Sequence, residues 1–188
     1  MNTLFDISPS LPEGFRYHDD FITPEEEIQL TDIVAAIGVQ PMQFHQYEAK
    51  RKVASFGLGW SFTRQQLEPG NKIPAGFDFL VKRVAALEGI ETAAIAQFLV
   101  TEYPVGAVIN WHRDAPPFDT IIGVSLAADC TFKLRPHEKE KQHRRATISL
   151  PVKRRSVYIM KGPAKNEWQH CTLPVNQLRY SLTFRTLK

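Results

Sequence analysis

His112, Arg113 and Asp114 place an imidazole and a carboxylate two residues apart. If this segment is a β-strand or the end of one, both side chains face the same side and can reach one metal ion. His170 lies far downstream, between two candidate strands, and offers a second imidazole. Two histidines and one carboxylate leave metal positions open, which suits a non-haem Fe(II) that must also bind a co-substrate and O₂. A lone His-x-Asp pattern is more often a turn held by hydrogen bonds, so this motif needs support from a second one.

A pair of arginines supplies that second motif. Arg179 and Arg185 lie six residues apart in the segment RYSLTFR, so on a strand they point to the same side. Ser181 and Thr183 share that side, and the apolar residues of the segment share the other. Inward-facing arginines are costly unless an anion neutralises them. A dicarboxylate such as 2-oxoglutarate would do so, because guanidinium groups bind carboxylates through two parallel hydrogen bonds. The alternative is an edge strand with solvated arginines.

The elements that must position these residues begin with a helix over residues 21–37. Thr23 is a candidate N-cap, Pro24 takes the first helical position, and Glu26 completes a capping box. Gly38 follows the last apolar residue of the helical stripe. The pattern therefore predicts a helix that begins after Thr23 and ends before Gly38.

The rest of the chain is predicted to form one more helix and many short strands. Residues 1–20 look irregular, residues 43–64 favour strands and loops, and residues 74–88 show a second helical stripe. Eight short segments are expected as strands: 96–103, 107–112, 120–126, 130–134, 145–150, 156–160, 171–175 and 179–185. Strands at this close spacing are typical of a β-sandwich or a jelly roll.

Length and composition narrow the class of protein. A chain of 188 residues that is 43% hydrophobic fits one domain better than two. No apolar run approaches the roughly 18 residues of a membrane helix, and the first residues lack the basic and apolar regions of a secretory signal. Cys130 and Cys171 show no zinc-like spacing and are expected as reduced thiols. We therefore expect a cytoplasmic protein without a membrane partner.

The positive charge of the chain is concentrated in one segment. From Lys133 to Arg155 there are nine Lys or Arg and two acidic residues, a charge of +7, which leaves −4 for the rest of a chain whose net charge is +3. Such a stretch suits a polyanionic partner such as nucleic acid. The alternative is a solvated loop that charge keeps soluble.

In combination, these motifs resemble those of a known family. A histidine follows His112 after 58 residues, and an Arg-x5-Arg strand begins nine residues after His170. The segments TEYPVGAVINWHRD, GVSLAADCTFKL, RRSVYIMKGPAKNEWQH and RYSLTFR are similar to successive motifs of the AlkB-like 2-oxoglutarate dioxygenases. The resemblance covers residues 97–188, and KRKVASFG in the other half is similar to the nucleotide-recognition lid of bacterial members.

The resemblance implies the fold and the domain organisation. We expect an α+β, mainly β fold, in which a double-stranded β-helix (jelly roll) carries N-terminal helices and a substrate-recognition lid. One domain would span residues 1–188. Within it, residues 1–95 would form the helices and the lid, and residues 96–188 would form the catalytic core.

The resemblance also implies an activity. The chain would be an oxidoreductase in which His112, Asp114 and His170 bind Fe(II), with 2-oxoglutarate as co-substrate and O₂ as oxidant. It would oxidatively dealkylate N-alkylated bases in DNA or RNA and release an aldehyde, succinate and CO₂. A base inside a duplex cannot reach such a site, so the base must be flipped out or already single-stranded.

Co-substrate residues follow from the same resemblance. Arg179 would pair with the distal carboxylate of 2-oxoglutarate, and Tyr103 would donate a hydrogen bond to the co-substrate. Arg185 would lie near the 1-carboxylate or support Asp114. The chain departs from the family at Thr101, where the family has Asn, and the role of this position stays open.

The lid would supply contacts to an alkylated nucleic acid. Lys50, Arg51 and Lys52 are candidates for phosphate contacts, which would make affinity depend on salt. Aromatic side chains could stack on the base, although each is more often a core residue. The candidates are Phe56 and Trp60, followed by Phe44, Tyr47 and Phe62.

Two other functions remain open at this point. An oxygenase of the same fold could act on a protein or a small molecule. A metal-binding jelly roll without catalysis would leave the inward arginine pair unexplained.

Segment 115–117, directly after the His-x-Asp motif, carries no acid, whereas some DNA-repairing members have one there. We expect a monomer.

Overall fold

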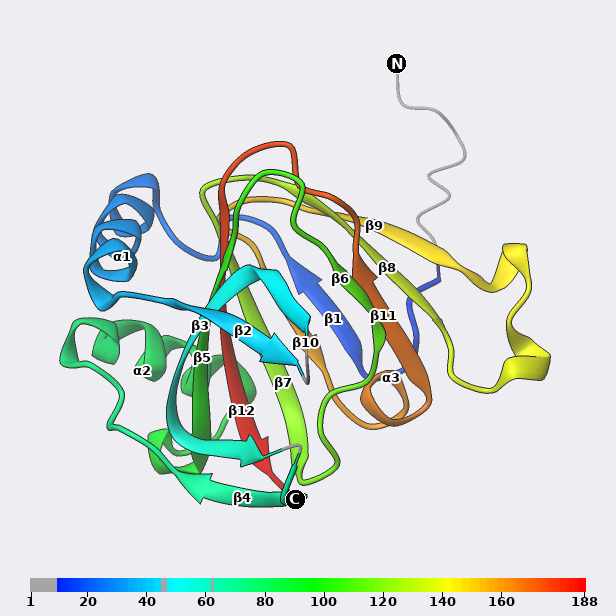
Figure 1. The fold of residues 1–188 in the computed structure, drawn as a ribbon, viewed down its shortest axis with the longest axis horizontal. Helices are drawn as coiled ribbons and strands as arrows, with labels where there is room; N and C mark the ends of the chain where they lie inside the picture. The colour runs from blue at the N-terminus through cyan, green and yellow to red at the C-terminus, as the bar shows by residue number, and fades with distance from the viewer. Residues whose placement is uncertain (1–9, 45–46, 62) are drawn as a thin grey trace.

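Two antiparallel β-sheets face each other in the computed structural model, which describes residues 10–44, 47–61 and 63–188 (Figure 1). Among these residues, the larger sheet has eight strands in the order β1-β10-β7-β12-β5-β3-β2, with β4 paired to β3. Their bounds are β1 Phe15–His18, β2 Gln40–Phe44, β3 Tyr47–Ser61, β4 Gln66–Pro69, β5 Ile95–Tyr103, β7 Phe118–Leu126, β10 Val157–Met160 and β12 Arg179–Leu187. This arrangement confirms the predicted mainly β jelly roll.

The smaller sheet carries the other strands of the described residues. It has four strands in the order β6-β11-β8-β9. Their bounds are β6 Ile109–His112, β8 Cys130–Pro136, β9 Ile148–Val152 and β11 Trp168–Thr172. A short helix, α3 (Pro163–Asn166), joins β10 of the larger sheet to β11 of the smaller one. The smaller sheet therefore covers one face of the larger sheet.

Helix α1 (Pro24–Ile37) begins and ends where the sequence predicts. The Thr23 hydroxyl accepts a hydrogen bond from the Glu26 backbone N–H at 3.2 Å, and the Glu26 carboxylate accepts one from the Thr23 N–H at 2.9 Å. Gly38 ends the helix in the left-handed conformation, with φ 73°, where a glycine is at no steric disadvantage. The capping box thus fixes the start of the helix that covers the larger sheet.

The two long helices pack on the face of the larger sheet that points away from the smaller one (Figure 1). The predicted second helix is a 3₁₀ turn, Ala75–Phe77, followed by α2 (Asp78–Glu88). Phe98 of β5 lies at the centre of this core, with its ring 4.7 Å from the rings of both Phe77 and Phe184. This apolar layer fixes β5 and β12, which carry polar residues on their opposite face.

Three strands depart most clearly from the expectation. Residues 15–18 form the edge strand β1 on β10, although residues 1–20 look irregular. Strand β9 begins at Ile148 instead of 145, because Arg144–Ala146 form a 3₁₀ turn. Strand β11 spans Trp168–Thr172 instead of 171–175, because its first residues pair with the end of β8. His170 therefore lies inside a strand and not between two strands.

Cys130 and Cys171 are free thiols, and both are buried. Among the described residues, no helix combines the length and apolar character needed to cross a membrane.

Candidate active site

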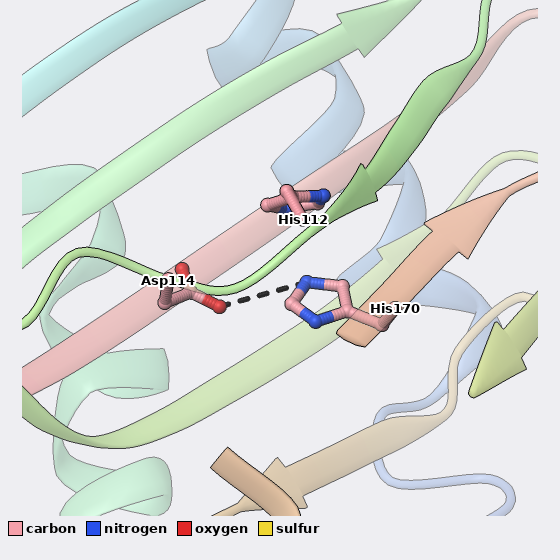
Figure 2. A group of neighbouring side chains, drawn as sticks. All are labelled: His112, Asp114 and His170. Atoms are coloured by element: carbon pink, nitrogen blue, oxygen red, sulfur yellow. Dashed lines mark ion pairs between the residues drawn. The ribbon is translucent and has the colours of Figure 1, made fainter. Parts of the chain in front are cut away.

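His112, Asp114 and His170 converge between the two sheets (Figure 2). His112 ends β6, and the antiparallel register of β6 and β11 places it opposite His170. Asp114 follows in the segment that leads to β7. One potential ligand atom from each residue lies within 4.8 Å of the others, and His170 Nε2 is 3.5 Å from an Asp114 oxygen. The structure thus brings together the three residues singled out by type and spacing.

Arg185 fixes the orientation of Asp114. Its Nε and Nη2 atoms donate hydrogen bonds of 3.0 and 2.7 Å to the same carboxylate oxygen, Oδ1. Gln97 holds the other end of the guanidinium group by accepting a bond from Nη1 at 2.5 Å. The second oxygen, Oδ2, is left on the side of His170. Of the two roles that the resemblance implied for Arg185, the geometry favours support of Asp114.

The surroundings keep Asp114 ionised. Burial by itself raises the pKa of this carboxyl, but the neighbouring Arg185 guanidinium group, followed by His170 and His112, outweighs burial and lowers the pKa to about 2. A carboxylate that stays charged at neutral pH is available as a metal ligand, because a metal competes with protons for the same oxygen lone pairs.

The two imidazoles present lone pairs to the same point. Burial, followed by the proximity of His112, lowers the pKa of His170 to about 3, so its ring is neutral at physiological pH. Phe132 stacks on that ring at 5.2 Å. His112 Nδ1 lies 2.8 Å from the Asn110 carbonyl oxygen. A carbonyl only accepts, so Nδ1 carries the proton and Nε2 is free to ligate a metal.

This donor set fits Fe(II). Imidazole nitrogens and a carboxylate oxygen suit divalent iron, and three protein ligands leave positions for other molecules. The ligands are held by partners of their own, namely Arg185, the Asn110 carbonyl and Phe132. Such support is typical of metal sites, because it fixes the orientation of each ligand before the metal binds.

A cavity extends from the three ligands along the inner face of the larger sheet. Strands β5, β7, β10 and β12 line it on one side, and β6, β8 and β11 line it on the other. The ring of Tyr158 lies across Gly123 on β7, where a Cβ atom would come within 2.2 Å of it. Glycine at this position therefore lets the tyrosine form part of the wall.

Arg179 lies at the other end of this cavity from Arg185 along β12. It is only 2% exposed, donates a hydrogen bond from Nε to Ser125 Oγ at 3.1 Å, and sits 5.0 Å from the centre of the Tyr103 ring. Among the described residues, no acidic side chain lies within ion-pair distance of it. Since burying a guanidinium group without a counter-charge is costly, this end of the cavity is suited to an anion.

Tyr103 and Thr101 complete this end of the cavity. Both are buried on the cavity side of β5, opposite Arg179 and Ser181 of β12. Burial is the main reason that the pKa of Tyr103 is raised, so its phenol keeps its proton and can donate a hydrogen bond. Thr101 presents a hydroxyl group to the same space.

The lid candidates of β3 divide between its two faces. Lys52 donates to Glu102 across the β3–β5 pair at 2.9 Å, and Phe56 stacks on Phe98 at 5.9 Å in the core under the helices. This packing favours the alternative interpretation of Phe56 as a core residue. Arg51 points to the other face, where burial lowers its pKa and the Tyr103 phenol opposes the shift.

Of the remaining candidates, one packs towards the cavity side, one is exposed, and three lie wholly or partly outside the described residues. Trp60 is half-buried and packs against the cluster that contains Tyr103 and Phe132, and Lys50 is exposed. The side chains of Phe44 and Tyr47, and all of Phe62, lie outside the described residues.

Sequence reasoning missed three residues that support the ligands: Gln97, Asn110 and Phe132. Gln97 pairs with Arg185 in the β5–β12 register, so a partner for Arg185 could have been sought on β5 once the two strands were paired. Asn110 precedes His112 by two residues and acts through its backbone carbonyl. Because every residue type has such a carbonyl, no sequence signal could have found it.

Three potential metal ligands and a buried arginine without an acidic partner among the described residues line one cavity, which suits an oxygenase that binds a carboxylate co-substrate at its metal. The family model of the 2OG-Fe(II) oxygenase superfamily matches residues 14–185, and the chain belongs to that superfamily. It is therefore a 2-oxoglutarate-dependent dioxygenase whose cofactors are Fe(II), 2-oxoglutarate and O₂.

A curated relative is similar to most of this chain. The tRNA (carboxymethyluridine(34)-5-O)-methyltransferase alkbh8 of Xenopus tropicalis is 24% identical over 176 residues, which are 89% of this chain. The chain spans only 26% of that relative's length. The similarity therefore concerns one part of a much longer protein.

Solved structures share the fold at low sequence identity. OsALKBH1 matches with a TM-score of 0.71 and 15% identity, covering 95% of this chain and 99% of its own. A Pseudomonas putida prolyl-4-hydroxylase matches with a TM-score of 0.65 and 13% identity, covering 93% of both chains. A Trichoplax adhaerens prolyl hydroxylase, solved with a hypoxia inducible factor peptide, gives 0.63 and 13%, covering 93% and 83%. At these identities the likeness concerns the fold alone.

Proposed function

We propose that this dioxygenase removes alkyl groups from N-alkylated bases in DNA or RNA, with His112, Asp114 and His170 as the iron ligands. One observation carries the assignment of the centre: the three ligands and the unpaired Arg179 line a single cavity. A divalent metal and a dicarboxylate bound there would be neighbours.

The residues of the chain then have distinct tasks. Arg179 binds the distal carboxylate of 2-oxoglutarate, and the Tyr103 hydroxyl donates a hydrogen bond to the same molecule. Arg185 holds one oxygen of Asp114 and so turns the other towards the metal. With Fe(II), 2-oxoglutarate and O₂ bound, the centre supplies an oxidation that yields succinate and CO₂ and hydroxylates a C–H bond of the substrate. On an N-alkyl group, the hydroxylated carbon leaves as an aldehyde and the unmodified base remains.

Two observations support nucleic acid as the substrate. Strand β3, next to the cavity-bearing strand β5, carries the exposed Lys50 and, on the cavity side, Arg51, where cations can contact phosphates on either side of a flipped base. Lys52 is paired with Glu102 on the other face and is not assigned to this contact. Trp60, half-buried against the cavity-side cluster, is the best-placed of the described lid aromatics for stacking on a base. The relative alkbh8, named for its action on tRNA, is consistent with this substrate.

A turnover assay tests the proposal. Single-stranded DNA and RNA oligonucleotides carrying different N-methylated bases are incubated with the protein, Fe(II), 2-oxoglutarate and O₂. Succinate and formaldehyde are then measured on the same samples. We expect equal amounts of both products with at least one methylated oligonucleotide, and no formaldehyde with its unmethylated counterpart.

Other outcomes separate the alternatives. If no methylated oligonucleotide yields formaldehyde while a protein or small molecule stimulates succinate formation, the substrate proposal is wrong and the centre stands. If Arg179→Met and wild-type protein form succinate with the same dependence on 2-oxoglutarate, the assignment of the co-substrate residue is wrong.

A further inference from the structure

The cations of the basic segment 133–155 form two groups in the structure. Three of its nine cations form ion pairs with acidic residues outside the segment: Lys153 with Asp129, Arg154 with Glu27, and Arg155 with Asp20. These pairs link the turn between β9 and β10 to α1, to the segment before α1, and to the turn before β8. The positive charges of these three residues are therefore neutralised by acidic residues of the protein itself.

The second group lies on the β8–β9 hairpin, drawn in yellow at the right of Figure 1. Segment 137–147 joins the two strands through the 3₁₀ turns Lys139–Lys141 and Arg144–Ala146, and neither turn has a buried residue. Lys139, Arg144 and Arg145 are exposed, and no acidic side chain of the described residues lies within ion-pair distance of them. Lys141 pairs only with Glu138, which is itself exposed.

The hairpin has a defined shape in spite of its exposure. The Gln142 side chain donates hydrogen bonds to the carbonyls of Pro136 and His137, at 3.1 and 3.0 Å. The His137 N–H donates to the Glu167 carbonyl at 2.7 Å, three residues before the proposed iron ligand His170. The cations are therefore presented by a folded connection attached next to the strand that carries this ligand.

The outer face of β8 continues the same basic surface towards β6. The Arg135 guanidinium group lies 4.3 Å from the centre of the Trp111 ring, and its Nε donates to Gln169 at 2.8 Å. Lys133 points outwards two residues earlier. These contacts hold Arg135 beside Trp111, the residue that precedes His112.

We propose that the β8–β9 hairpin and the outer face of β8 form a phosphate-binding track for the strand that flanks the modified base. The track consists of Lys133, Arg135, Lys139, Lys141, Arg144 and Arg145, and with Glu138 and Glu140 its net charge is +4. This inference rests on the proposed function, since it assumes a nucleic-acid substrate. Unpaired exposed cations bind phosphates with release of counterions, without reading base sequence.

A binding experiment tests the track without requiring catalysis. The affinity of the metal-free protein for an unmodified, fluorescently labelled single-stranded oligonucleotide is measured by anisotropy at several salt concentrations. Wild type is compared with R144Q/R145Q and with K72Q/K82Q, which removes two exposed cations near the helices, on the opposite side of the molecule (Figure 1).

Each phosphate contact on a single strand contributes about 0.7 to the slope of log affinity against log salt. We expect R144Q/R145Q to reduce that slope by about 1.4, so that its affinity falls about sevenfold less than that of wild type between about 50 and 200 mM salt. K72Q/K82Q should keep the wild-type slope.

Two results would overturn the inference, and they are distinguishable. Salt-dependent binding with the same slope in R144Q/R145Q and wild type would exclude the track and leave the proposed substrate intact. No binding of the oligonucleotide by wild type, even at low salt, would contradict both the track and the nucleic-acid substrate.

Discussion

Strand β12 has two buried faces of different chemistry. On the helix side, Leu182 and Phe184 are fully buried among apolar side chains. On the cavity side, Arg179 and Ser181 are only 2% and 3% exposed, yet they are polar. Burial is almost equal, so the difference lies in what each face contacts. The apolar face is completed by the protein itself, whereas in the proposed function the polar face is completed by an anion and a metal ion.

Because the two faces have different contacts, we expect substitutions on the two sides to change different quantities. Those around the cavity should reduce turnover and ligand binding with little loss of stability. Those on the helix side should reduce stability and leave the chemistry of the folded fraction unchanged. A substitution on one side that changed both the stability and the turnover of the folded fraction would show that the two faces are coupled.

The largest effect is expected for His170→Ala. Loss of one of three iron ligands should reduce 2-oxoglutarate turnover by about 10³-fold or more, because several kcal/mol of metal-borne stabilisation is lost. The measurement is succinate formation at saturating Fe(II). His137→Ala, which removes an exposed histidine of the hairpin, is the matched control and should keep wild-type turnover. Activity above a tenth of wild type in His170→Ala would remove this residue from the iron site.

The opposite face is probed by Leu182→Ala. Removing a fully buried leucine side chain should cost about 2–5 kcal/mol of unfolding free energy, measured by urea denaturation. Iron stoichiometry of the folded protein should stay at the wild-type value. If stability is unchanged and iron is lost, the assignment of the two faces is wrong.

A smaller effect is expected for Arg179→Met. The loss of a charged hydrogen-bonding partner should raise the KM for 2-oxoglutarate about 10–100-fold, while Fe(II) binding stays unchanged. The KM is obtained from the steady-state rate of succinate formation at varied 2-oxoglutarate concentrations. Arg83→Met, which removes an arginine paired with Glu26 on the helix side, should leave that KM unchanged. Equal values in Arg179→Met and wild type would contradict the proposed carboxylate contact.

The smallest effect is expected for Thr101→Val, which replaces the hydroxyl by a methyl group of similar size. If the hydroxyl contacts the co-substrate, the KM for 2-oxoglutarate should rise by about fivefold, equivalent to one hydrogen bond of about 1 kcal/mol. An unchanged KM would show that Thr101 only lines the wall.

Local signals in the sequence were sufficient for several parts of the fold and the site. The capping box of Thr23 and Glu26 located α1, because both partners lie within one turn. The spacing of His112 and Asp114, and the alternation along β12, indicated which side chains share a face. These inferences depend only on residue spacing along a short stretch of the chain.

Features that depend on pairing between distant segments could not be predicted. Strand β1 forms because β10 offers it an open edge, and β11 begins at Trp168 because β8 extends to Pro136. Alternation shows that Arg51 and Lys52 face opposite sides, but only the register with β5 shows which side holds the cavity. The choice between two roles for Arg185 likewise depended on how closely Asp114 approaches it.

Iron K-edge X-ray absorption of the Fe(II)-loaded protein tests the central claim most directly, because it reports the ligands of the metal. The account predicts two imidazole nitrogens in wild type and in His137→Ala, and one fewer in His170→Ala. An unchanged number of imidazole ligands in His170→Ala would contradict the assignment of His112, Asp114 and His170 as the iron centre.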